Sequence, residues 1–319
     1  MADNVIGIDI GGTNLRGALV DSEGNILKRM KILSEADQGI DKLIYNLTNF
    51  ITDISKGEKV TNIGVGIPGI LNSKNGTITQ APNILNVDDY PLRSALNEKL
   101  GSDLNVVIEN DANSAALGEW WMGVSKDVSS MIMLTLGTGV GGGIVLGGKL
   151  WTGADGMAGE IGHITIYPDG ARCNCGNYGC LESYASATAI RRMVKEGLED
   201  ENLNTVLRET TEKAHMEDVP KIVMEAARSG DDFSLRIWQE LGKALGIGIA
   251  SLVNLLNIEM VVIGGGVSNA WDLFIDTTYE EAHRRAFRAP MKRVKIERGL
   301  LRDDAGILGS VYLALHSSK

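Results

Sequence analysis

Two stretches of the chain share one pattern, in which an apolar run meets a glycine turn and a second apolar run follows. Residues 5–21 turn at residues 11–13 (Gly-Gly-Thr), and residues 131–146 turn at residues 137–139 (Gly-Thr-Gly). Apolar runs that flank such tight turns predict buried strands joined as hairpins. The chain therefore looks like two copies of one unit, each of which contains a glycine hairpin.

Other parts of the chain carry apolar residues at helical spacing. Residues 40–54 predict an amphipathic helix that packs on a sheet, and residues 233–257 predict a long helix. Gly242, Gly246 and Gly248 in the long helix indicate close packing of a neighbour. Further helices are expected over residues 185–197, 271–288 and 303–319, and further strands over residues 63–67, 106–108, 260–263 and 294–296. Strands and helices mixed in this way predict an α/β fold.

Each glycine hairpin is a candidate binding site for a phosphate group. Glycines let backbone amides approach an anion closely, and Thr13 adds a hydroxyl. Asp9 stands at the end of the first strand, where a carboxylate can hold a hydrated Mg²⁺. A tight hairpin without any ligand is the alternative. Neither hairpin opens a helix and the chain has no Gly-Lys-Ser/Thr sequence, so we reject Walker-type and dinucleotide-binding sites.

Asp111 is the candidate for proton transfer. It follows the strand expected over residues 106–108 and precedes a segment that favours helix. Open α/β sheets place their ligands at this end of the strands, where a carboxylate can accept a hydroxyl proton while Asn110 orients a polyol. Helix capping is the alternative for Asp111. Asn83, in a loop further upstream, is either a ligand contact or a turn residue.

The three cysteines of the chain share one short segment with a histidine. Cys173, Cys175, Cys180 and His163 offer the sulfur and nitrogen donors of a closed tetrahedral zinc site. A Cys175–Cys180 disulfide and unrelated buried thiols are the alternatives. The spacing therefore predicts a structural zinc ion that orders this loop.

Two carboxylates flank these ligands. Glu160 lies just before His163, and Glu182 follows the last cysteine with its side chain left free to face elsewhere. A zinc-bound imidazole keeps its other ring nitrogen free for a hydrogen bond, and a sugar hydroxyl could be the partner here. We therefore expect these three side chains to converge on one small region.

Composition limits the class of protein. With 319 residues the chain is long enough for two domains, and we expect them at residues 1–114 with 303–319, and at residues 115–302. A formal charge of −10 without a Lys/Arg cluster argues against a nucleic-acid partner. No secretory signal and no long apolar run is found, so we expect a cytoplasmic protein without a membrane segment.

Taken together, the motifs resemble the ROK family of sugar kinases and related regulators, within the actin-like ATPase superfamily. The resemblance covers nearly the whole chain and rests on six motifs: Asp9-Ile-Gly-Gly-Thr-Asn14, Glu109-Asn-Asp-Ala-Asn113, Leu136-Gly-Thr-Gly139, Glu160-Ile-Gly-His163, the Cys-x-Cys-Gly-x-x-Gly-Cys-x-Glu run of residues 173–182, and Ile263-Gly-Gly-Gly266. No functional position departs from the family pattern.

This resemblance implies a duplicated ribonuclease-H-like fold with two domains around a cleft. It also implies a role for each motif. Asp111 would be the general base, and Asp9 would help to hold Mg²⁺. The phosphates of ATP would be bound by Gly11, Gly12, Thr13, Asn14, Gly137, Thr138 and Gly139, and adenosine would lie against Gly264, Gly265 and Gly266. The sugar would be bound by Asn110, Glu160, His163 and Glu182, with Gly69 and Asn83 as further candidates.

The resemblance further implies an ATP-dependent hexose kinase, for which we expect glucose as substrate and glucose 6-phosphate as product. N-acetylmannosamine, fructose, allose and mannose are alternative substrates, because loop geometry decides which hydroxyls are recognised. A sugar-sensing regulator of the family would carry a helix-turn-helix region before the first hairpin, and only about eight residues precede Asp9, so we do not expect one. A homodimer is implied by the resemblance alone.

Overall fold

The computed structural model describes residues 4–81, 84–85, 87–101 and 104–317, so Asn83 lies outside the described residues. The chain forms two compact units that are interleaved in sequence. The first comprises Met1–Met133, Gly143–Gly159 and Gly299–Lys319, and the second comprises Leu134–Gly142 and Glu160–Arg298. The expected domain limits near residues 114 and 302 stay a prediction. Among the described residues, no helix is long and apolar enough to cross a membrane.

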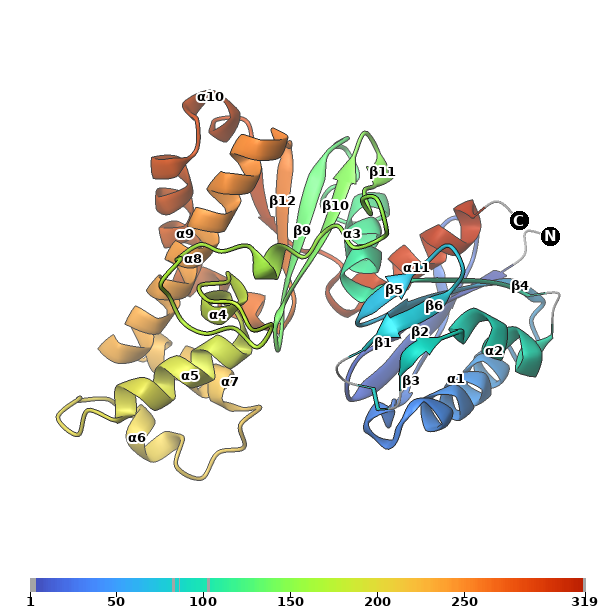
Figure 1. Cartoon of the computed structure of the whole chain (residues 1–319), viewed down its shortest axis with the longest axis horizontal. Helices are drawn as coiled ribbons and strands as arrows, with labels where there is room; N and C mark the ends of the chain where they lie inside the picture. The colour runs from blue at the N-terminus through green and yellow to red at the C-terminus, as the bar shows by residue number, and fades with distance from the viewer. Residues whose placement is uncertain (1–3, 82–83, 86, 102–103, 318–319) are drawn as a thin grey trace. The chain divides into compact units, whose positions relative to one another are not determined.

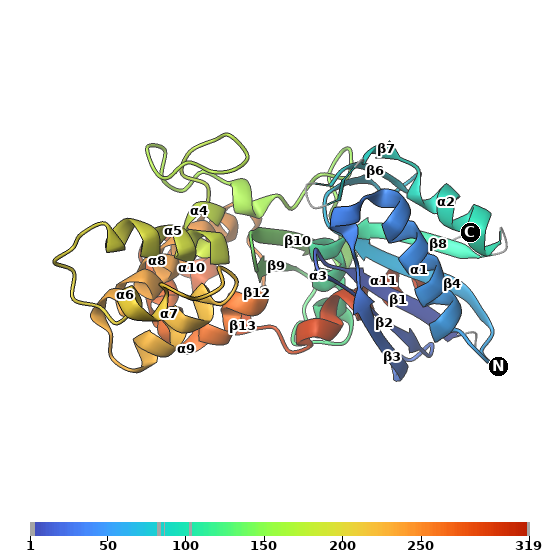
Figure 2. The ribbon, with the colours of Figure 1, turned by 90° about the horizontal axis from the view of Figure 1, so that it is seen from below.

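The first unit is built on a five-stranded sheet of order β3-β2-β1-β4-β8 (Figures 1 and 2). Its strands are β1 (Asn4–Ile10), β2 (Asn14–Val20), β3 (Ile26–Leu33), β4 (Val60–Ile67) and β8 (Asn105–Asn110). Strands β1, β2 and β3 are antiparallel neighbours, whereas β1, β4 and β8 run parallel. The hairpin predicted from residues 5–21 is thus confirmed as β1 and β2.

Helices cover both faces of this sheet, as the alternation of side chains along a strand requires. From β1, Ile6 and Ile8 pack in the core formed with α1 (Ile40–Ile54) and α2 (Leu92–Leu100). Val5 packs on the opposite side, in the core formed with α11 (Ala305–His316). Helix α3 (Asp111–Trp121) packs on α11 in turn (Figures 1 and 2).

A second five-stranded sheet has the order β11-β10-β9-β12-β13. Its strands are β9 (Met131–Leu136), β10 (Val140–Leu146), β11 (Lys149–Leu150), β12 (Met260–Gly264) and β13 (Lys295–Arg298). The edge strand predicted near residues 294–296 is confirmed as β13. A small sheet of β5 (Ile70–Asn72), β6 (Thr77–Gln80) and β7 (Asp88–Tyr90) contains the hairpin that turns at Asn75 and Gly76.

The helices of the second unit include the predicted long helix, α8 (Asp232–Leu256), which packs along α9 (Trp271–Arg285) (Figure 2). A side chain at Gly242 would meet the Phe274 carbonyl oxygen at 2.6 Å, so the close packing expected at this glycine is confirmed. The other helices are α4 (Glu182–Ala185), α5 (Ala187–Leu198), α6 (Leu207–Thr210), α7 (Val219–Arg228) and α10 (Arg288–Met291).

Several elements have no counterpart in the predicted pattern, among them β3, β7 and α2. Strand β3 shows why. It lies at the edge of its sheet and carries Lys28, Arg29 and Lys31, which are exposed. Charged residues on an edge strand discourage pairing with another chain, but they also remove the apolar run that would identify the strand from sequence.

Glycine makes the contact between α3 and α11 possible, and this yields a first prediction. A Cβ atom at Gly309 of α11 would overlap the carbonyl oxygen of Ser114 in α3. Gly309→Ala should therefore destabilise the protein by at least about 2 kcal/mol, as overpacking of a rigid backbone contact does. Chemical denaturation measures this change. The matched variant Gly12→Ala faces open space and should unfold like the wild type; equal stability of all three proteins would contradict the prediction.

Candidate active site and metal centre

The parallel strands of the first unit bring two predicted acidic residues to one edge of the sheet. Asp9 of β1 pairs with Gly66 of β4, and Gly66 pairs with Glu109 of β8. Parallel strands end at the same edge of a sheet, so Asp9 and Glu109 lie at one edge. Asp111 follows Glu109 by two residues and therefore comes directly after this edge. The repulsion that Asp9 experiences from the Asp111 carboxylate shows that the two groups are electrostatic neighbours.

The surroundings of Asp9 oppose its ionisation. Burial raises the pKa of Asp9 from 3.8 to about 7, with a further increase from Asp111 and a smaller one from Asp303, and Arg16 acts in the opposite direction. Arg16 lies directly across the β1–β2 pair from Asp9 and forms a 2.7 Å ion pair with Asp303. A buried carboxylate whose ionisation is opposed by a neighbouring carboxylate lies in an environment that favours a cation.

Asn110 rather than Asp111 caps helix α3. The Asn110 side-chain oxygen accepts hydrogen bonds from the amides of Ala112 at 2.9 Å and Asn113 at 3.2 Å, and its amide nitrogen donates to the Gly69 carbonyl at 3.2 Å. Asp111 is the first residue of the helix, and its Oδ1 also accepts from Ala112 at 2.9 Å. Asn110 therefore takes most of the capping role that was considered for Asp111. The cap holds Asp111 at the first position of the helix.

In the first glycine hairpin, the protein itself captures the carbonyl oxygens of the turn. The Ser34 hydroxyl donates to Gly12 O at 2.9 Å, and the Ser34 amide donates to Thr13 O at 3.0 Å. Ser34 is fully buried, while Gly12 and Thr13 are exposed. Two carbonyl oxygens of the turn are thus bonded within the protein and would not face a bound anion.

The second glycine hairpin has its carbonyl oxygens captured by helix α5. The Ala187 amide donates to Gly137 O at 2.8 Å, and the Thr188 hydroxyl donates to Thr138 O at 2.7 Å. A third contact is made beside the turn, where Glu182 Oε2 accepts from the Val140 amide at 2.9 Å. In both hairpins, therefore, carbonyl oxygens of the turn are bonded within the protein, although by different elements.

The predicted adenosine loop lies beside this second hairpin. Gly265, with a φ angle of 83°, follows β12, and a Cβ atom there would overlap the backbone of Leu136, the last residue of β9. Only a glycine fits both this conformation and this approach. The Ser268 hydroxyl donates to Gly265 O at 2.7 Å and fixes the loop. Within the second unit, the glycine loop of residues 264–266 and the hairpin of residues 137–139 are thus neighbours.

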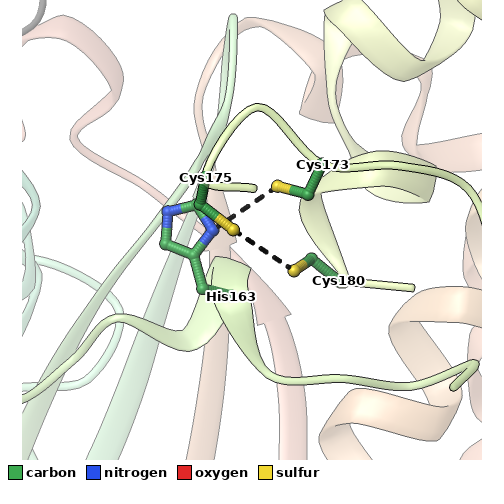
Figure 3. A group of neighbouring side chains, drawn as sticks. All are labelled: His163, Cys173, Cys175 and Cys180. Atoms are coloured by element: carbon green, nitrogen blue, oxygen red, sulfur yellow. Dashed lines mark hydrogen bonds between the residues drawn. The ribbon is translucent and has the colours of Figure 1, made fainter. Parts of the chain in front are cut away.

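The four predicted zinc ligands converge (Figure 3). Their donor atoms all lie within 4.8 Å of one another. Cys173 Sγ is 3.7 Å from His163 Nδ1, and Cys175 Sγ is 3.7 Å from Cys180 Sγ. Zinc–sulfur bonds of about 2.3 Å in a tetrahedron place neighbouring ligand atoms about 3.8 Å apart. The donor set therefore has the chemistry and the spacing of a structural zinc site, and the three cysteines are free thiols.

Backbone pairing holds the ligands in this arrangement. Cys173 N donates to Asn177 O at 2.8 Å, and Thr165 pairs with Cys180 as an isolated bridge. Gly179 has a φ angle of 67° and no room for a side chain against Tyr167. Burial raises the pKa of Cys180 to about 12, so this thiol would ionise only with a cation beside it.

The flanking carboxylates have different surroundings. Glu160 Oε2 lies 3.9 Å from His163 Nε2, the ring nitrogen that faces away from the cysteines, so this expected convergence is present. Glu182 is not free: one oxygen accepts from Val140, and the other lies 3.8 Å from Cys173 Sγ. Glu182 therefore connects the metal cluster to the second hairpin, a link that the spacing of the motif did not reveal.

These residues form two groups, one in each unit. The model of the ROK family matches residues 5–317. The glucokinase of Thermotoga maritima is 37% identical over 97% of this chain and 96% of its own length. A xylose repressor of Caldicellulosiruptor bescii is 36% identical over 98% of this chain and 78% of its own length.

A solved structure agrees with these relatives. The crystal structure of a ROK family glucokinase from Streptomyces griseus, in complex with glucose and AMPPNP, has a TM-score of 0.83 and 34% identity, and the match covers 98% of this chain and 100% of that chain. This chain belongs to the ROK family, and its α/β fold with two mixed five-stranded sheets is the actin-like ATPase fold of those structures.

Several residues in these groups have no motif that would have identified them in advance. Arg16 and Ser34 act on the first hairpin and its strand, and Thr188 acts on the second. Arg16 lies two residues after the motif of residues 9–14. Its position opposite Asp9 in a predicted hairpin could have indicated that the two side chains interact. Ser34 and Thr188 are common residue types in common surroundings, and only the fold brings them to the turns.

The pKa of Asp9 yields a second prediction. Its value in the folded, metal-free protein lies above its usual value, so Asp9 makes folding less favourable as the pH rises from about 4 through about 7. The melting temperature of metal-free wild type should fall between pH 5 and pH 8, and the fall should be smaller in Asp9→Asn. Calorimetry across this range tests the difference. Asp53→Asn, at an exposed site on α1, should match the wild type; parallel curves for wild type and Asp9→Asn would refute it.

Proposed function

We propose that this protein is an ATP-dependent hexose kinase that phosphorylates glucose to glucose 6-phosphate. The observation that carries the proposal is the placement of Asp111 at the first residue of α3, beside the Asp9 carboxylate and at the strand edge where ligands bind in this fold. Relatives that are glucokinases support the reaction, and the S. griseus enzyme was solved with glucose and AMPPNP.

In the proposed mechanism Asp111 is the general base. Its carboxylate takes the proton from the 6-hydroxyl of glucose, the hydroxyl oxygen forms a bond to the γ-phosphorus of ATP, and the bond from that phosphorus to the β–γ bridging oxygen breaks to release ADP. General base catalysis contributes about 10²–10⁴-fold to such a reaction. Phosphoryl transfer depends chiefly on the positions of the reactants and on stabilisation of the phosphate charge. The hairpins would supply both.

The two hairpins would bind the phosphates through their backbone amides. The residues proposed for this role are Gly11, Gly12, Thr13, Asn14, Gly137, Thr138 and Gly139, with Gly264, Gly265 and Gly266 against the adenosine. Asp9 would hold Mg²⁺, which neutralises phosphate charge when bound. Because the turn carbonyls are already bonded within the protein, phosphate oxygens would meet donors and not acceptors.

The residues proposed for recognition of the sugar are Asn110, Asp111, Glu160, His163 and Glu182, with Gly69 and Asn83 as further candidates. His163 would bind zinc through Nδ1 and the sugar through Nε2, since the Nδ1 atom is the one that faces Cys173. The metal would thereby shape the sugar site without taking part in phosphoryl transfer.

Two alternatives follow from the relatives. Another hexose, such as N-acetylmannosamine, fructose, allose or mannose, could be the preferred substrate, and a non-catalytic sugar sensor is supported by the xylose repressors among the relatives. A panel of aldoses, ketoses and N-acetylated hexoses, assayed by coupled detection of ADP, separates these possibilities. Glucose with the highest kcat/KM supports the proposal; sugar binding without ADP formation from any hexose supports the sensor.

The base assignment yields a third prediction. Asp111→Ala should lower kcat by about 10²–10⁴-fold because the hydroxyl proton has no acceptor. The affinity for ADP, measured by titration calorimetry, should stay within about twofold of wild type, since the nucleotide does not depend on this carboxylate. The exposed Asp53→Ala serves as a control and should keep full activity. A variant at position 111 with wild-type kcat would exclude Asp111 as the base.

The zinc site yields a fourth prediction. Cys175→Ser, or treatment with a chelator, should remove the metal, lower the melting temperature by more than about 5 °C and raise the KM for glucose, because the loop orders both the fold and the sugar contacts. Elemental analysis, calorimetry and kinetics give the three readouts. Asn174→Ser changes an exposed neighbour in the same loop and should leave all three unchanged. Metal-free protein with an unaltered melting temperature and KM would refute the assignment.

A further inference from the structure

Arg191 on helix α5 takes part in no motif, yet it is connected to the second hairpin. Its Nη2 donates to the Thr188 hydroxyl at 2.9 Å, and that hydroxyl donates to Thr138 O at 2.7 Å. Its Nη1 donates to Met216 O at 3.3 Å, in the segment between α6 and α7. The guanidinium thus joins the turn at residues 137–139 to a segment about eighty residues further along the chain.

The donor and the acceptor are fixed in each hydrogen bond of this series. The single proton of the Thr188 hydroxyl is used on Thr138 O, so the hydroxyl can only accept from its other neighbour. Arg191 supplies the required donor, because a guanidinium has five N–H groups and accepts nothing. Loss of the arginine would leave the hydroxyl free to rotate away from Thr138, and the turn would lose its side-chain support.

The turn that this series of hydrogen bonds supports, at residues 137–139, is partly exposed. Thr138 is exposed, and among the described residues the amides of Thr138 and Gly139 have no hydrogen-bond acceptor. Arg191 is half-buried, and the three N–H groups that remain on its guanidinium have no partner within the part of the chain that the structure describes. A supported turn with amides that have no acceptor among the described residues, backed by a fixed positive charge, is suited to an anion.

We propose that Arg191 is a positioning residue for the nucleotide, acting through Thr188 to fix the second hairpin around the phosphates of ATP. This inference rests on the proposed kinase function and names a determinant of nucleotide affinity that is separate from hexose affinity. The neighbouring Arg192 does not share the role: it bonds Ser183 O and Glu196, and stacks on Tyr184. The two adjacent arginines therefore have different partners.

The test compares substitutions at both links. Arg191→Lys keeps the charge but loses the fork that reaches Thr188 and Met216 together, and Thr188→Val keeps the shape but loses the hydroxyl. Each should raise the KM for ATP and the Kd for ADP about tenfold, the loss expected for one charge-assisted hydrogen bond. The KM for glucose and the melting temperature should stay near their wild-type values.

The energetic coupling between Arg191 and Thr188 in ADP binding distinguishes a positioning role from a purely structural one. The double variant should be little worse than either single variant, because both changes break the same connection. Thr188→Ser restores the hydroxyl and should restore the affinity for ADP. Arg208→Met, which removes a guanidinium bonded to Leu198 O and Asp200 O at the other end of α5, is the matched control and should bind ADP like the wild type.

The outcomes separate the two proposals. If wild type phosphorylates no hexose, the proposed function fails, and calorimetry with ADP still tests Arg191. If wild type is active and both Arg191→Lys and Thr188→Val bind ADP with unchanged affinity, the role of Arg191 is overturned while the kinase function stands. Equal losses of ATP affinity, glucose affinity and thermal stability would assign Arg191 a structural role and also overturn the inference.

Discussion

Both glycine hairpins depend on hydrogen bonds to their carbonyl oxygens. A turn carries donors and acceptors in close succession, and a phosphate is repelled by the acceptors. Ser34 occupies the acceptors of the first turn, and α5 occupies those of the second. The turn carbonyls are thereby bonded within the protein, and this would let a chain with a net charge of −10 bind the proposed anionic nucleotide without a cluster of lysines.

In the sheet of the first unit, the register of the strands brings acidic residues to the same edge. Glycine at position 66 lies between Asp9 and Glu109, so no side chain separates the two strand ends at that level. Asn110 caps α3 and thereby fixes Asp111 at its start. In the second unit, Glu182 accepts a hydrogen bond from Val140 beside the second hairpin and approaches Cys173, so the second hairpin and the cysteine loop are linked through one side chain.

Much of this could be read from sequence, and the limits have physical causes. The hairpins, the long helix and the Cys₃His set follow local rules of spacing, so they were predicted and the structure contains them. The role of Glu182 was open because its partner, Val140, is distant in sequence. Edge strand β3 was missed because its charges hide its periodicity. Arg191 and Ser34 act through single contacts that only the tertiary fold creates.

The way in which α11 covers the first sheet has a consequence for synthesis. Val5, Ala18 and Val20 belong to a core that is completed by Ile307 and Val311. A nascent chain therefore exposes one apolar face of its N-terminal sheet until residues 305–316 leave the ribosome. The first unit cannot finish folding in the order in which it is made, and the whole second unit is synthesised in the meantime. Protection of that face by a chaperone during translation would suit such an arrangement.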